Sequence, residues 1–564
     1  MPLITKRWEV ASPPPAEAIQ ELGGYPDILR RILYNRGFRT HEQARTFLEA
    51  QPPSGTEPAN LIDLPKAVDR IKFAIQHREN IVVYGDYDAD GVTATALLSM
   101  ALKALGAEVR EYIPNRFDEG YGLNLEAMST LREQGSDLII TVDCGIRSWE
   151  EASYSLTAGM DLIITDHHYP LDILPQAYAI INPKQMGDNY PEKNLAGVGL
   201  AYKLVDLLFK SVPNPLDPRE YLDLVALGTV ADLVPITGEN RSLVRNGLEY
   251  LRQPRRQGIM ALIGVSGLSP ARITAADISF TLAPRLNASG RLDSALASLN
   301  LLTSQNLKEA GQLAQWLELQ NRDRQKIMRD IQTNAEQKII VSDKIPLLLF
   351  AADPEYNAGV VGLAASRLTE QYYRPSIIAS IGDKYTRGSC RSISEFHITQ
   401  ALDQCKDLLE HHGGHAAAAG FTVRNDLLQA LIDKLLIIAT EQLDEKDLRP
   451  KIFAEAEIPL SDLKPDILKS LEWLQPTGMG NPAPIFMSRG LKVTRQKAIG
   501  ADGAHLKLTV TDGKITYDAI AFRQGYWIAQ LPPLIDLMYT FELNEFNGQV
   551  SLQLNVKDIR SSLE

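Results

Sequence analysis

The stretch IVVYGDYDADG (81–91) decides the fold, because a short apolar run leads directly into a cluster of aspartates. The same order recurs where DLII (137–140) precedes TVDCG and where DLII (161–164) precedes TDHH. Short apolar runs that alternate with helix-like segments are typical of buried parallel strands. We therefore predict an α/β fold built on a parallel sheet.

Acidic and imidazole side chains follow each predicted strand, and a further acidic block, GTVADLVP (228–235), lies later in the chain. In an open α/β sheet, ligands bind beyond the carboxyl ends of the strands, so these side chains should share one crevice. Carboxylates with a few imidazoles suit Mn²⁺ or Mg²⁺, and this many carboxylates exceed the needs of one ion. Two ions about 3.5–4 Å apart would activate water and hold a phosphoryl group, which predicts a two-metal phosphodiester hydrolase. The predicted metal and catalytic residues are Asp86, Asp88, Asp90, Asp143, His167, His168 and Asp232.

GDYDADG (85–91) also matches the start of a calcium-binding loop, which is an alternative reading of the block. That loop needs glutamate at its twelfth position and a preceding helix, whereas this chain has Leu97 and a strand-like run. A solvated acidic turn is the other alternative for a single block. Recurrence of such blocks after successive predicted strands argues against it.

The composition is ordinary for a soluble globular protein, with 45% hydrophobic and 23% charged residues over 564 positions. The start, MPLITKRWEV, lacks the apolar core of a signal peptide, and no apolar run reaches the length of about eighteen residues needed to span a membrane. Three cysteines without a CxxC pair indicate a reducing compartment, so we expect a cytoplasmic protein. The net charge of −12 argues only mildly against nucleic acid, because phosphate affinity depends on local basic surface.

Changes of pattern divide the chain into segments. Residues 306–338 are amphipathic with the helical period, which predicts one long connecting helix with Ser304 as its N-cap. The C-terminal part has short strand-like segments with regular turns, which predict a small barrel of the oligonucleotide-binding class. The expected bounds are 1–75 for an N-terminal extension, 76–240 for the metal-binding catalytic domain, 241–340 for a helical region, 341–447 for a second α/β domain and 448–564 for the barrel.

Several blocks combine arginine with glycine or small residues, a pattern that suits phosphate oxygens. They are IPNRFDEGYGL (113–123), the turn-like APRLNASGR (283–291) and RGSCRS (387–392). GGHAAAAG (413–420) has no arginine and is a candidate for a different reason, because its two glycines allow close approach of the backbone. In the last block the alanine run is expected to open a helix whose N-terminus attracts an anion. Surface ion pairs and tight helix packing are the alternatives. The candidate substrate-binding residues are Arg116, Arg285, Asn287, Arg291, Ser389, Arg391 and His415.

Residues 489–514, inside the predicted barrel, carry six basic side chains against two acidic ones. With Phe522 and Tyr526 nearby to stack on bases, this pattern fits a groove for single-stranded nucleic acid. A solvated barrel surface is the alternative. If the groove reading is right, a chain cut near Pro450 should still hydrolyse very short oligonucleotides and lose its hold on long strands.

GDYDADG, TVDCG, TDHH and ALGTVADLVP resemble the four metal motifs of the DHH phosphoesterase family. Four further blocks resemble those of its bacterial single-stranded-DNA exonucleases, and the match covers nearly the whole chain: APRLNASGR, RGSCRS, GGHAAAAG and LQPTGMGNPAPIF (474–486). The resemblance implies a DHH domain, a DHHA1-type domain and an oligonucleotide-binding (OB) barrel. Asn357, where the family usually has histidine, and Cys390, where it usually has glycine, depart from the pattern.

The resemblance also implies digestion of single-stranded DNA from the 5′ end to mononucleotides, with two Mn²⁺ or Mg²⁺ ions, in DNA repair and recombination. It places Arg116, Ser389 and Arg391 at the 5′ phosphate end. Expected partners are single-stranded DNA, a single-strand-binding protein and a helicase, and we expect a monomer that does not associate with membranes. The alternatives are a DHH phosphatase or oligoribonuclease acting on small nucleotides, and an inactive DHH-fold replication scaffold.

Overall fold

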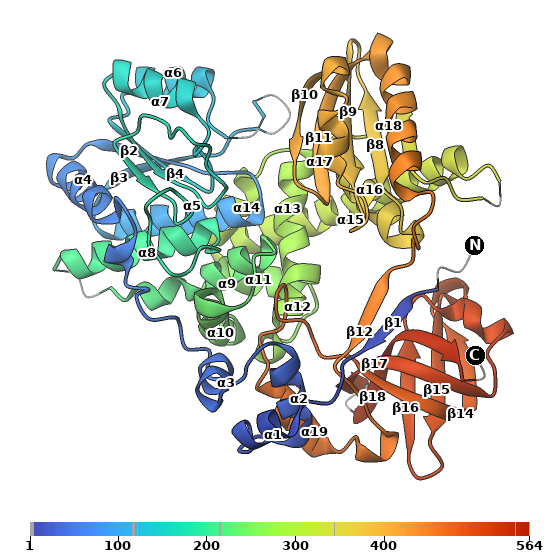
Figure 1. Ribbon diagram of the computed structural model, residues 1–564. Coiled ribbons are helices and arrows are strands. Elements are labelled where there is room, and N and C mark those ends of the chain that lie inside the picture. Colours follow the sequence, from blue (N-terminus) through green and yellow to red (C-terminus); the bar gives the residue numbers. More distant parts are fainter. Residues whose placement is uncertain are drawn as a thin grey trace.

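A computed structural model describes residues 5–115, 119–120, 122–213, 216–342, 344–546 and 549–562. Two α/β units lie side by side, joined by helices that include a long one, and a β-barrel lies below the second unit in the view of Figure 1. Among the described residues, no helix has the length and apolar character needed to cross a membrane.

The first unit contains a wholly parallel sheet with the strand order β3-β2-β4-β5-β6. Alternate residues of its strands enter opposite cores: Ile81 and Val83 face one layer of helices, whereas Val82 and Tyr84 face the other. Burial on both faces explains why these strands read as continuous apolar runs. The strands are β2 (Asn80–Tyr84), β3 (Glu108–Tyr112), β4 (Leu138–Val142), β5 (Asp161–Thr165) and β6 (Ala179–Ile181). The helices are α4 (Leu64–His77), α5 (Ala89–Ala104), α6 (Leu125–Glu133), α7 (Trp149–Thr157) and α8 (Gly197–Ser211).

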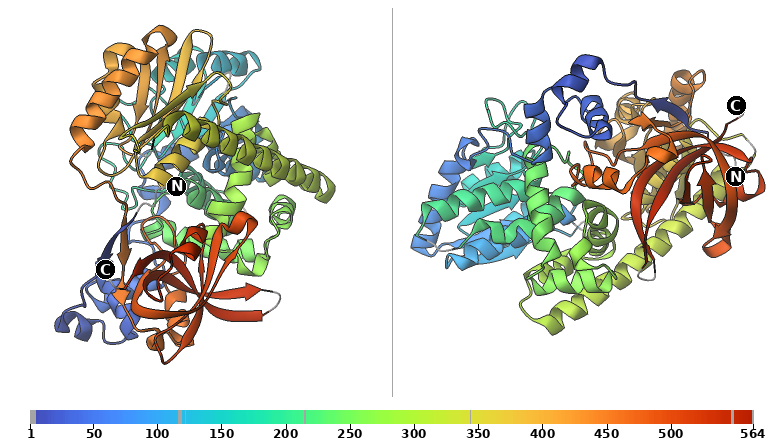
Figure 2. Two further views of the ribbon diagram at one scale, coloured as in Figure 1. Left: turned by 90° about the vertical axis from the view of Figure 1, so that its right-hand side faces the viewer. Right: turned by 90° about the horizontal axis from the view of Figure 1, so that it is seen from below.

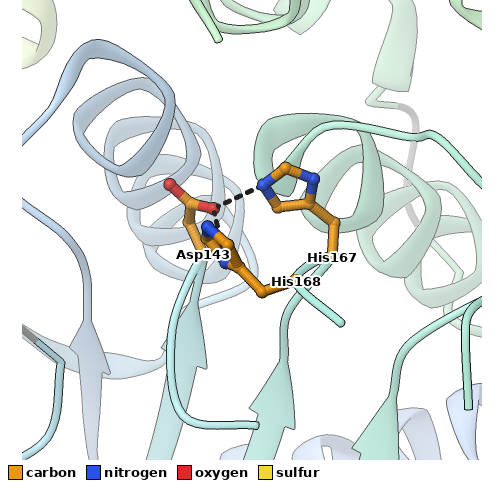
Figure 3. A group of neighbouring side chains, drawn as sticks. All are labelled: Asp143, His167 and His168. Carbon is orange, nitrogen blue, oxygen red and sulfur yellow. Dashed lines mark ion pairs between the residues drawn. The ribbon is translucent and has the colours of Figure 1, made fainter. Parts of the chain in front are cut away.

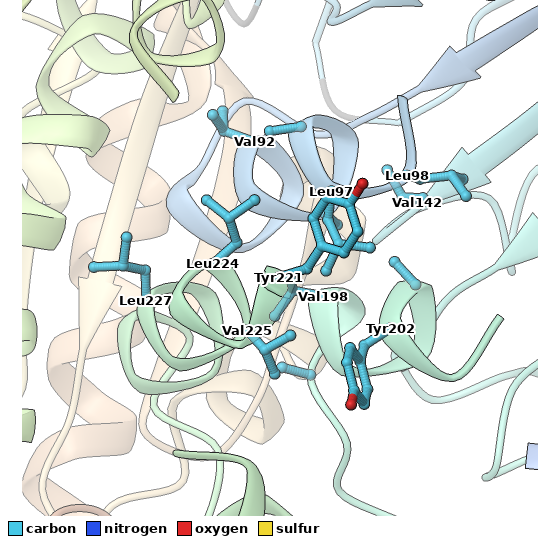
Figure 4. Packing of buried hydrophobic residues seen from close by; sticks show 14 of the residues in the cluster. Val92, Leu97, Leu98, Val142, Val198, Tyr202, Tyr221, Leu224, Val225 and Leu227 are labelled. Atoms are coloured by element: carbon cyan, nitrogen blue, oxygen red, sulfur yellow. The ribbon is translucent and has the colours of Figure 1, made fainter. Parts of the chain in front are cut away.

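Apolar side chains of α5 and α8 pack against α9, and together they form the largest buried core (Figure 4). Val92 and Leu97 come from α5, Val198 from α8, and Leu224 and Val225 from α9. This core fixes the first unit to the helical region that follows it. The helices of that region are α9 (Leu222–Ala231), α10 (Gly238–Arg252), α11 (Gln257–Val265), α12 (Ala275–Asp277), α13 (Ala283–Leu292), α14 (Leu296–Thr303) and α15 (Leu307–Ile339).

Two local predictions about this region were wrong. Residues 283–291, expected to be turn-like, lie in helix α13, which continues a π-helical segment at Ile278–Leu282. The long helix α15 is present, but its N-cap is Asn306, whose side chain accepts hydrogen bonds from the backbone N–H groups of Lys308 and Glu309. Ser304 instead donates its hydroxyl to the Glu309 carboxylate. Asparagine caps as well as serine does, so the position of the cap depends on where the preceding helix ends.

The second unit has a mixed sheet with the order β10-β11-β9-β8-β7, in which only β7 and β8 run parallel. The predicted helix in GGHAAAAG is wrong, because this segment turns between β10 and β11. Pairing of Ala418 with Arg391 and of Gly420 with Ser389 on β9 overrides the helical propensity of the alanine run. The elements are β7 (Leu349–Asp353), α16 (Val361–Tyr372), β8 (Ser376–Ile381), β9 (Tyr385–Arg391), α17 (Ile398–Asp403), β10 (Leu409–Gly414), β11 (Ala418–Arg424) and α18 (Leu428–Leu443).

The C-terminal sheet has the order β13-β14-β15-β16-β18-β17 and closes into a barrel through pairing of β14 with β17. Closure removes exposed sheet edges and leaves loops and one outer face for contacts. Its strands are β13 (Ala456–Glu457), β14 (Phe486–Ile499), β15 (His505–Thr511), β16 (Thr516–Ala521), β17 (Leu534–Phe546) and β18 (Gln549–Ser561).

The N-terminal segment is part of the barrel unit. Strand β1 (Arg7–Val10) pairs in parallel with β12 (Lys451–Ala454), and both figures of the whole chain show the blue strand beside the barrel (Figures 1 and 2). Leu29, Leu33 and Phe47 share one buried cluster with barrel residues such as Phe486. The two ends of the chain therefore build one core. The remaining helices of this unit are α1 (Ala16–Glu21), α2 (Asp27–Asn35), α3 (His41–Leu48) and α19 (Pro465–Glu472).

Candidate metal centre and substrate cleft

The loops at the carboxyl ends of β2, β4 and β5 bring the predicted acidic and imidazole side chains together. Within the described ranges, possible ligand atoms form three overlapping groups, each within 4.8 Å. Two groups share Asp143 and two share His167, which places the groups side by side. Asp232 differs from the other candidate ligands because it is the C-cap of helix α9 and follows no strand. The groups are Asp86–Asp88–Asp143, Asp143–His167–His168 and Asp90–His167–Asp232.

His167 belongs to two of the three groups, and its ring lies beside Asp143, the residue that both histidines face in Figure 3. Its Nε2 lies 3.1 Å from Asp143 Oδ1 and 3.5 Å from Asp232 Oδ2, and the residue is only 6% exposed. In the described part of the chain, neither ring nitrogen has a hydrogen-bond partner. A buried imidazole in this state is costly unless it binds something, and a divalent cation fits the surrounding oxygen atoms. The residues present therefore fit a metal.

Burial and mutual repulsion shift the proton affinities of the carboxylates. Burial, followed by the charges of Asp90 and Asp88, raises the pKa of Asp232 to about 9. Burial and Asp88 raise the pKa of Asp90 to about 7, while burial and neighbouring aspartates raise the pKa of Asp143. Burial, followed by the charge of His168, lowers the pKa of His167 to about 3, so its imidazole is neutral near pH 7. Excess buried negative charge beside a neutral imidazole is the electrostatic pattern of a cation site.

Backbone groups hold the aspartates of GDYDADG in place. Asp88 caps helix α5 by accepting from the N–H groups of Asp90 (2.9 Å) and Gly91 (3.1 Å). Asp90 accepts from the N–H groups of Gly197 (2.6 Å) and Val198 (2.9 Å) at the start of α8. A Cβ at Gly197 would lie 2.6 Å from the Cβ of Asp143, so only glycine allows α8 to approach the metal loops this closely.

Two further groups, Asp166 and Lys184, support the TDHH block. Asp166 Oδ1 accepts from His168 Nδ1 at 2.7 Å and from its backbone N–H at 3.0 Å, which fixes the ring. The second carboxylate oxygen of Asp166 accepts from Ile146 N–H. Lys184 donates to the carbonyl of His167 at 2.6 Å. Asp166 stands inside a recognised block, whereas no sequence pattern marks Lys184.

Helix α13 bridges the metal loops and the second α/β unit. Asn287 Oδ1 accepts from the N–H of Ala89, which follows Asp88, at 2.7 Å. Arg291 donates to the carbonyl of Gly359, just before α16, at 3.2 Å. Arg285 forms a 2.7 Å ion pair with Glu318 of α15. Asn287 and Arg285 thus have structural contacts in addition to any role with substrate.

The other predicted substrate residues gather on the second sheet. A Cβ at Gly362 of α16 would lie 3.2 Å from a guanidinium nitrogen of Arg391 and 3.4 Å from Ser389 Oγ, so α16 packs directly on these side chains. Cys390 points to the opposite face, where it is buried in the core. His415 is exposed at the β10–β11 turn. Arg116 lies outside the described residues, and Asn357 accepts from Gly359 N–H at 2.9 Å to form a turn before α16.

Part of the predicted basic surface of the barrel is exposed and part is neutralised. Arg495 and Lys497 are exposed on β14, with Lys497 paired opposite Lys507 of β15. Lys507 forms an ion pair with Asp518, and Arg489 lies 3.1 Å from Glu457. The aromatic rings predicted to stack, Phe522 and Tyr526, are 54% and 46% exposed. The adjacent cations and exposed rings are compatible with a groove for single-stranded nucleic acid, which stays a prediction.

The fold and site define a DHH-type protein: a parallel sheet with clustered aspartates and histidines, followed by a second α/β unit. Family models agree, matching "DHH family, N-terminal domain" at residues 80–229, "DHHA1 domain" at 336–442 and "RecJ OB domain" at 454–558. The chain belongs to the RecJ family. The predicted family and fold class are therefore confirmed.

The relatives are similar over nearly the whole chain. The single-stranded-DNA-specific exonuclease RecJ of Bacillus subtilis is 37% identical over 98% of this chain and 70% of its own length. RecJ of Salmonella typhimurium is 36% identical over 95% of this chain and 96% of its own. The crystal structure of Thermus thermophilus RecJ with Mn²⁺ has a TM-score of 0.84 at 31% identity and covers 98% of this chain and 79% of that one. The same protein has also been solved with Mg²⁺.

Proposed function

We propose that this chain is a single-stranded-DNA-specific exonuclease that hydrolyses phosphodiester bonds from the 5′ end with two bound Mn²⁺ or Mg²⁺ ions. The observation that carries the proposal is the overlap of ligand groups at Asp143 and His167. Overlapping groups suit two neighbouring cations better than one. Similarity to proteins named single-stranded-DNA-specific exonucleases supports the substrate class.

Each protein group at the site has a definite task in this reaction. When bound, the two ions would supply an activated water and charge stabilisation at the phosphoryl group. Asp143 and His167 would hold both ions, and the lowered pKa of His167 keeps its nitrogen available to a cation near neutral pH. Asp166 orients His168 toward the site, and Lys184 steadies the backbone at His167. Helix α13 holds the metal loops and the second sheet at a fixed separation through Asn287 and Arg291.

The 5′ direction of digestion is implied by the RecJ resemblance, and the structure offers a place for the strand end. Ser389 and Arg391 lie together on β9 beside α16, and Arg291 connects this region to the helix that contacts the metal loops. A terminal phosphate held there by the Arg391 fork would place the first phosphodiester toward the metals. Arg116 belongs to the same proposal by its motif.

We also propose the division of labour among segments that the sequence predicts. Residues 76–240 bind metal, 341–447 bind the strand end and 448–564 grip the strand farther along. The enzyme acts as a monomer in the cytoplasm, in DNA repair and recombination, with a single-strand-binding protein and a helicase as partners. These roles follow from the RecJ resemblance and from single-stranded DNA as the substrate class.

The direct test is digestion of end-labelled single- and double-stranded DNA and RNA with Mn²⁺ or Mg²⁺. Asp143→Asn is the matched inactive control, because Asp143 has a φ of 64° and asparagine tolerates that left-handed conformation. We expect 5′ label to be released first, from single-stranded DNA only, by the wild type and not by the variant. Equal cleavage of a 5-mer and a long strand would favour a small-nucleotide phosphatase or oligoribonuclease. Absence of any cleavage by the wild type would favour an inactive scaffold.

A further inference from the structure

Arg241 of helix α10 is the largest fully buried side chain in the described ranges, and it is only 1% exposed. Its three nitrogens donate to five backbone carbonyl oxygens, and its guanidinium carbon lies 4.2 Å from the centre of the Phe47 ring. The charged groups that act on it are Arg245 and Arg36, which have the same sign. Burial and these charges lower the pKa of Arg241 to about 10.

The carbonyl partners of Arg241 define its role. Four of them belong to consecutive residues at the start of the 473–481 loop, which leads from helix α19 toward barrel strand β14. Their distances from the guanidinium nitrogens are 2.9–3.1 Å. The fifth is Phe47 of α3, at 2.8 Å. One planar fork thus ties two segments that are distant in sequence, α3 and the 473–481 loop, to helix α10, a geometry that the lysine ammonium cannot reproduce.

The other end of the 473–481 loop contacts the segment that carries a metal ligand. The N–H of Ile236 donates to the carbonyl of Met479 at 2.7 Å. A Cβ at Gly480, which has a φ of 72°, would lie 3.2 Å from Pro235 Cβ. Pro235 and Ile236 follow Asp232 by three and four residues.

The backbone after Asp232 needs this external support. Asp232 ends helix α9, and the next residue, Leu233, has a φ of 62°, which is unfavourable for a leucine. A residue held in that region persists only when surrounding contacts fix it. The 473–481 loop supplies such contacts, and Arg241 fixes the loop.

We propose that Arg241 is a positioning residue for the metal centre: it clamps the 473–481 loop, which in turn holds the turn that orients Asp232. The proposal rests on the proposed function only in taking Asp232 as a metal ligand. Under this proposal, the 473–481 loop supports the metal-binding site, although every predicted ligand lies before residue 235.

The test measures Mn²⁺ affinity directly, from the loss of the free-ion electron paramagnetic resonance signal, in the full-length protein. Arg241→Lys keeps the charge and removes the fork. Its control is Arg70→Lys, since Arg70 is 8% exposed and is held by Asp161 and Glu79, away from the loop. We expect Arg241→Lys to weaken Mn²⁺ binding about three- to tenfold, somewhat less than the 10–100-fold typical of groups that touch a ligand directly. Arg70→Lys should stay within about twofold of wild type.

A second pair of variants perturbs the loop from its exposed side, where misfolding is less of a concern. Gly480→Ala forces a side chain against Pro235, whereas Gly513→Ala strains a barrel turn of similar φ (89°) with no neighbour within 4 Å. Gly480→Ala should weaken Mn²⁺ binding as Arg241→Lys does, and Gly513→Ala should not. If Arg241→Lys and Gly480→Ala both bind Mn²⁺ like their controls while Asp232→Asn binds it weakly, the clamp is purely structural and the inference fails. If Asp232→Asn itself binds Mn²⁺ normally, the metal assignment fails instead.

Discussion

Replacement of Asp88 should separate its two roles, as a helix cap and as a metal-site carboxylate. Its side chain accepts from two N–H groups at the start of α5, and its charge raises the pKa values of Asp90, Asp143 and Asp232. Asp88→Ala removes both roles. Asp88→Asn keeps a capping oxygen and removes only the charge.

The two variants should therefore differ in stability and agree in activity. Loss of the cap costs about 1 kcal/mol, so the metal-free alanine variant should unfold at a lower temperature than the asparagine variant. Removing one of several repelling charges should leave metal-free Asp88→Asn at least as stable as the wild type. Mn²⁺ at 100 times its Kd adds about 2.7 kcal/mol per site to the wild type, and both variants should gain less. Both should lose at least about 10³-fold in cleavage rate, equivalent to about 4 kcal/mol.

Thermal unfolding in EDTA and in Mn²⁺, together with release of 5′ label from single-stranded DNA, measures each quantity. Binding of a labelled strand in EDTA is the control, and it should be nearly unchanged because the barrel is intact. Near-normal turnover of either variant at saturating Mn²⁺ would refute the assignment of Asp88 to the metal site. Equal stability of the two variants would refute its capping role.

Three further predictions concern pH, the strand end and the barrel. The folded-state pKa values of Asp90 (about 7) and Asp232 (about 9) lie above the ordinary value of 3.8, so the stability that these groups contribute to the metal-free protein is greatest at low pH and is lost as pH rises toward 9. Because Mn²⁺ must displace these protons, its affinity, followed by calorimetry, should increase between about pH 6 and 9, and a flat profile would contradict the raised pKa values. Arg391→Ala should weaken binding of a 5′-phosphorylated end by about 10–150-fold, because it removes a charge-assisted contact of about 1.5–3 kcal/mol. The control is Arg424→Ala, which replaces an exposed arginine paired with Asp426 and should leave this binding unchanged. Release of the 3′ label first by the wild type would contradict the assignment. Arg495→Ala and Lys497→Ala should each reduce the salt dependence of long-strand binding by about one unit of slope without slowing cleavage of very short oligonucleotides, and an unchanged slope would place the groove elsewhere.

Local sequence patterns identified side chains that the structure brings together at the candidate metal centre, because most of their loops directly follow a strand that is buried on both faces. The run before Asp86 and the run before Asp143 identify both the strand and the end of the sheet at which its loop lies. Convergence then follows from the parallel arrangement alone. Asp232 shows the limit of this reasoning, since it reaches the same site from the end of a helix.

Predictions that depended on intrinsic propensity were less successful. The alanine run of GGHAAAAG favours a helix in isolation, but pairing with β9 makes it a hairpin strand. The glycine, serine and asparagine of APRLNASGR favour a turn, yet the block is helical in α13, and Asn287 contacts Ala89 from that helix. Tertiary contacts of this kind outweigh preferences of less than about 1 kcal/mol per residue.

The contacts of Arg241 explain why the barrel cannot be treated as a removable attachment. A bond from a guanidinium to a backbone carbonyl does not depend on the side chain at the accepting position, so residues 473–476 carry no sequence signal of their partner. The same holds for the pairing of β1 with β12. A chain cut near Pro450 would lose β12, the 473–481 loop and the barrel half of the core that covers Leu29 and Leu33. It would also remove four of the five carbonyl groups that hold Arg241 and uncover its guanidinium, so the clamp between α10 and the 473–481 loop would be lost. Any loss of activity in such a chain would therefore mix weaker strand binding with damage to the metal centre, and the point substitutions at Lys497, Arg241 and Gly480 are needed to tell the two apart.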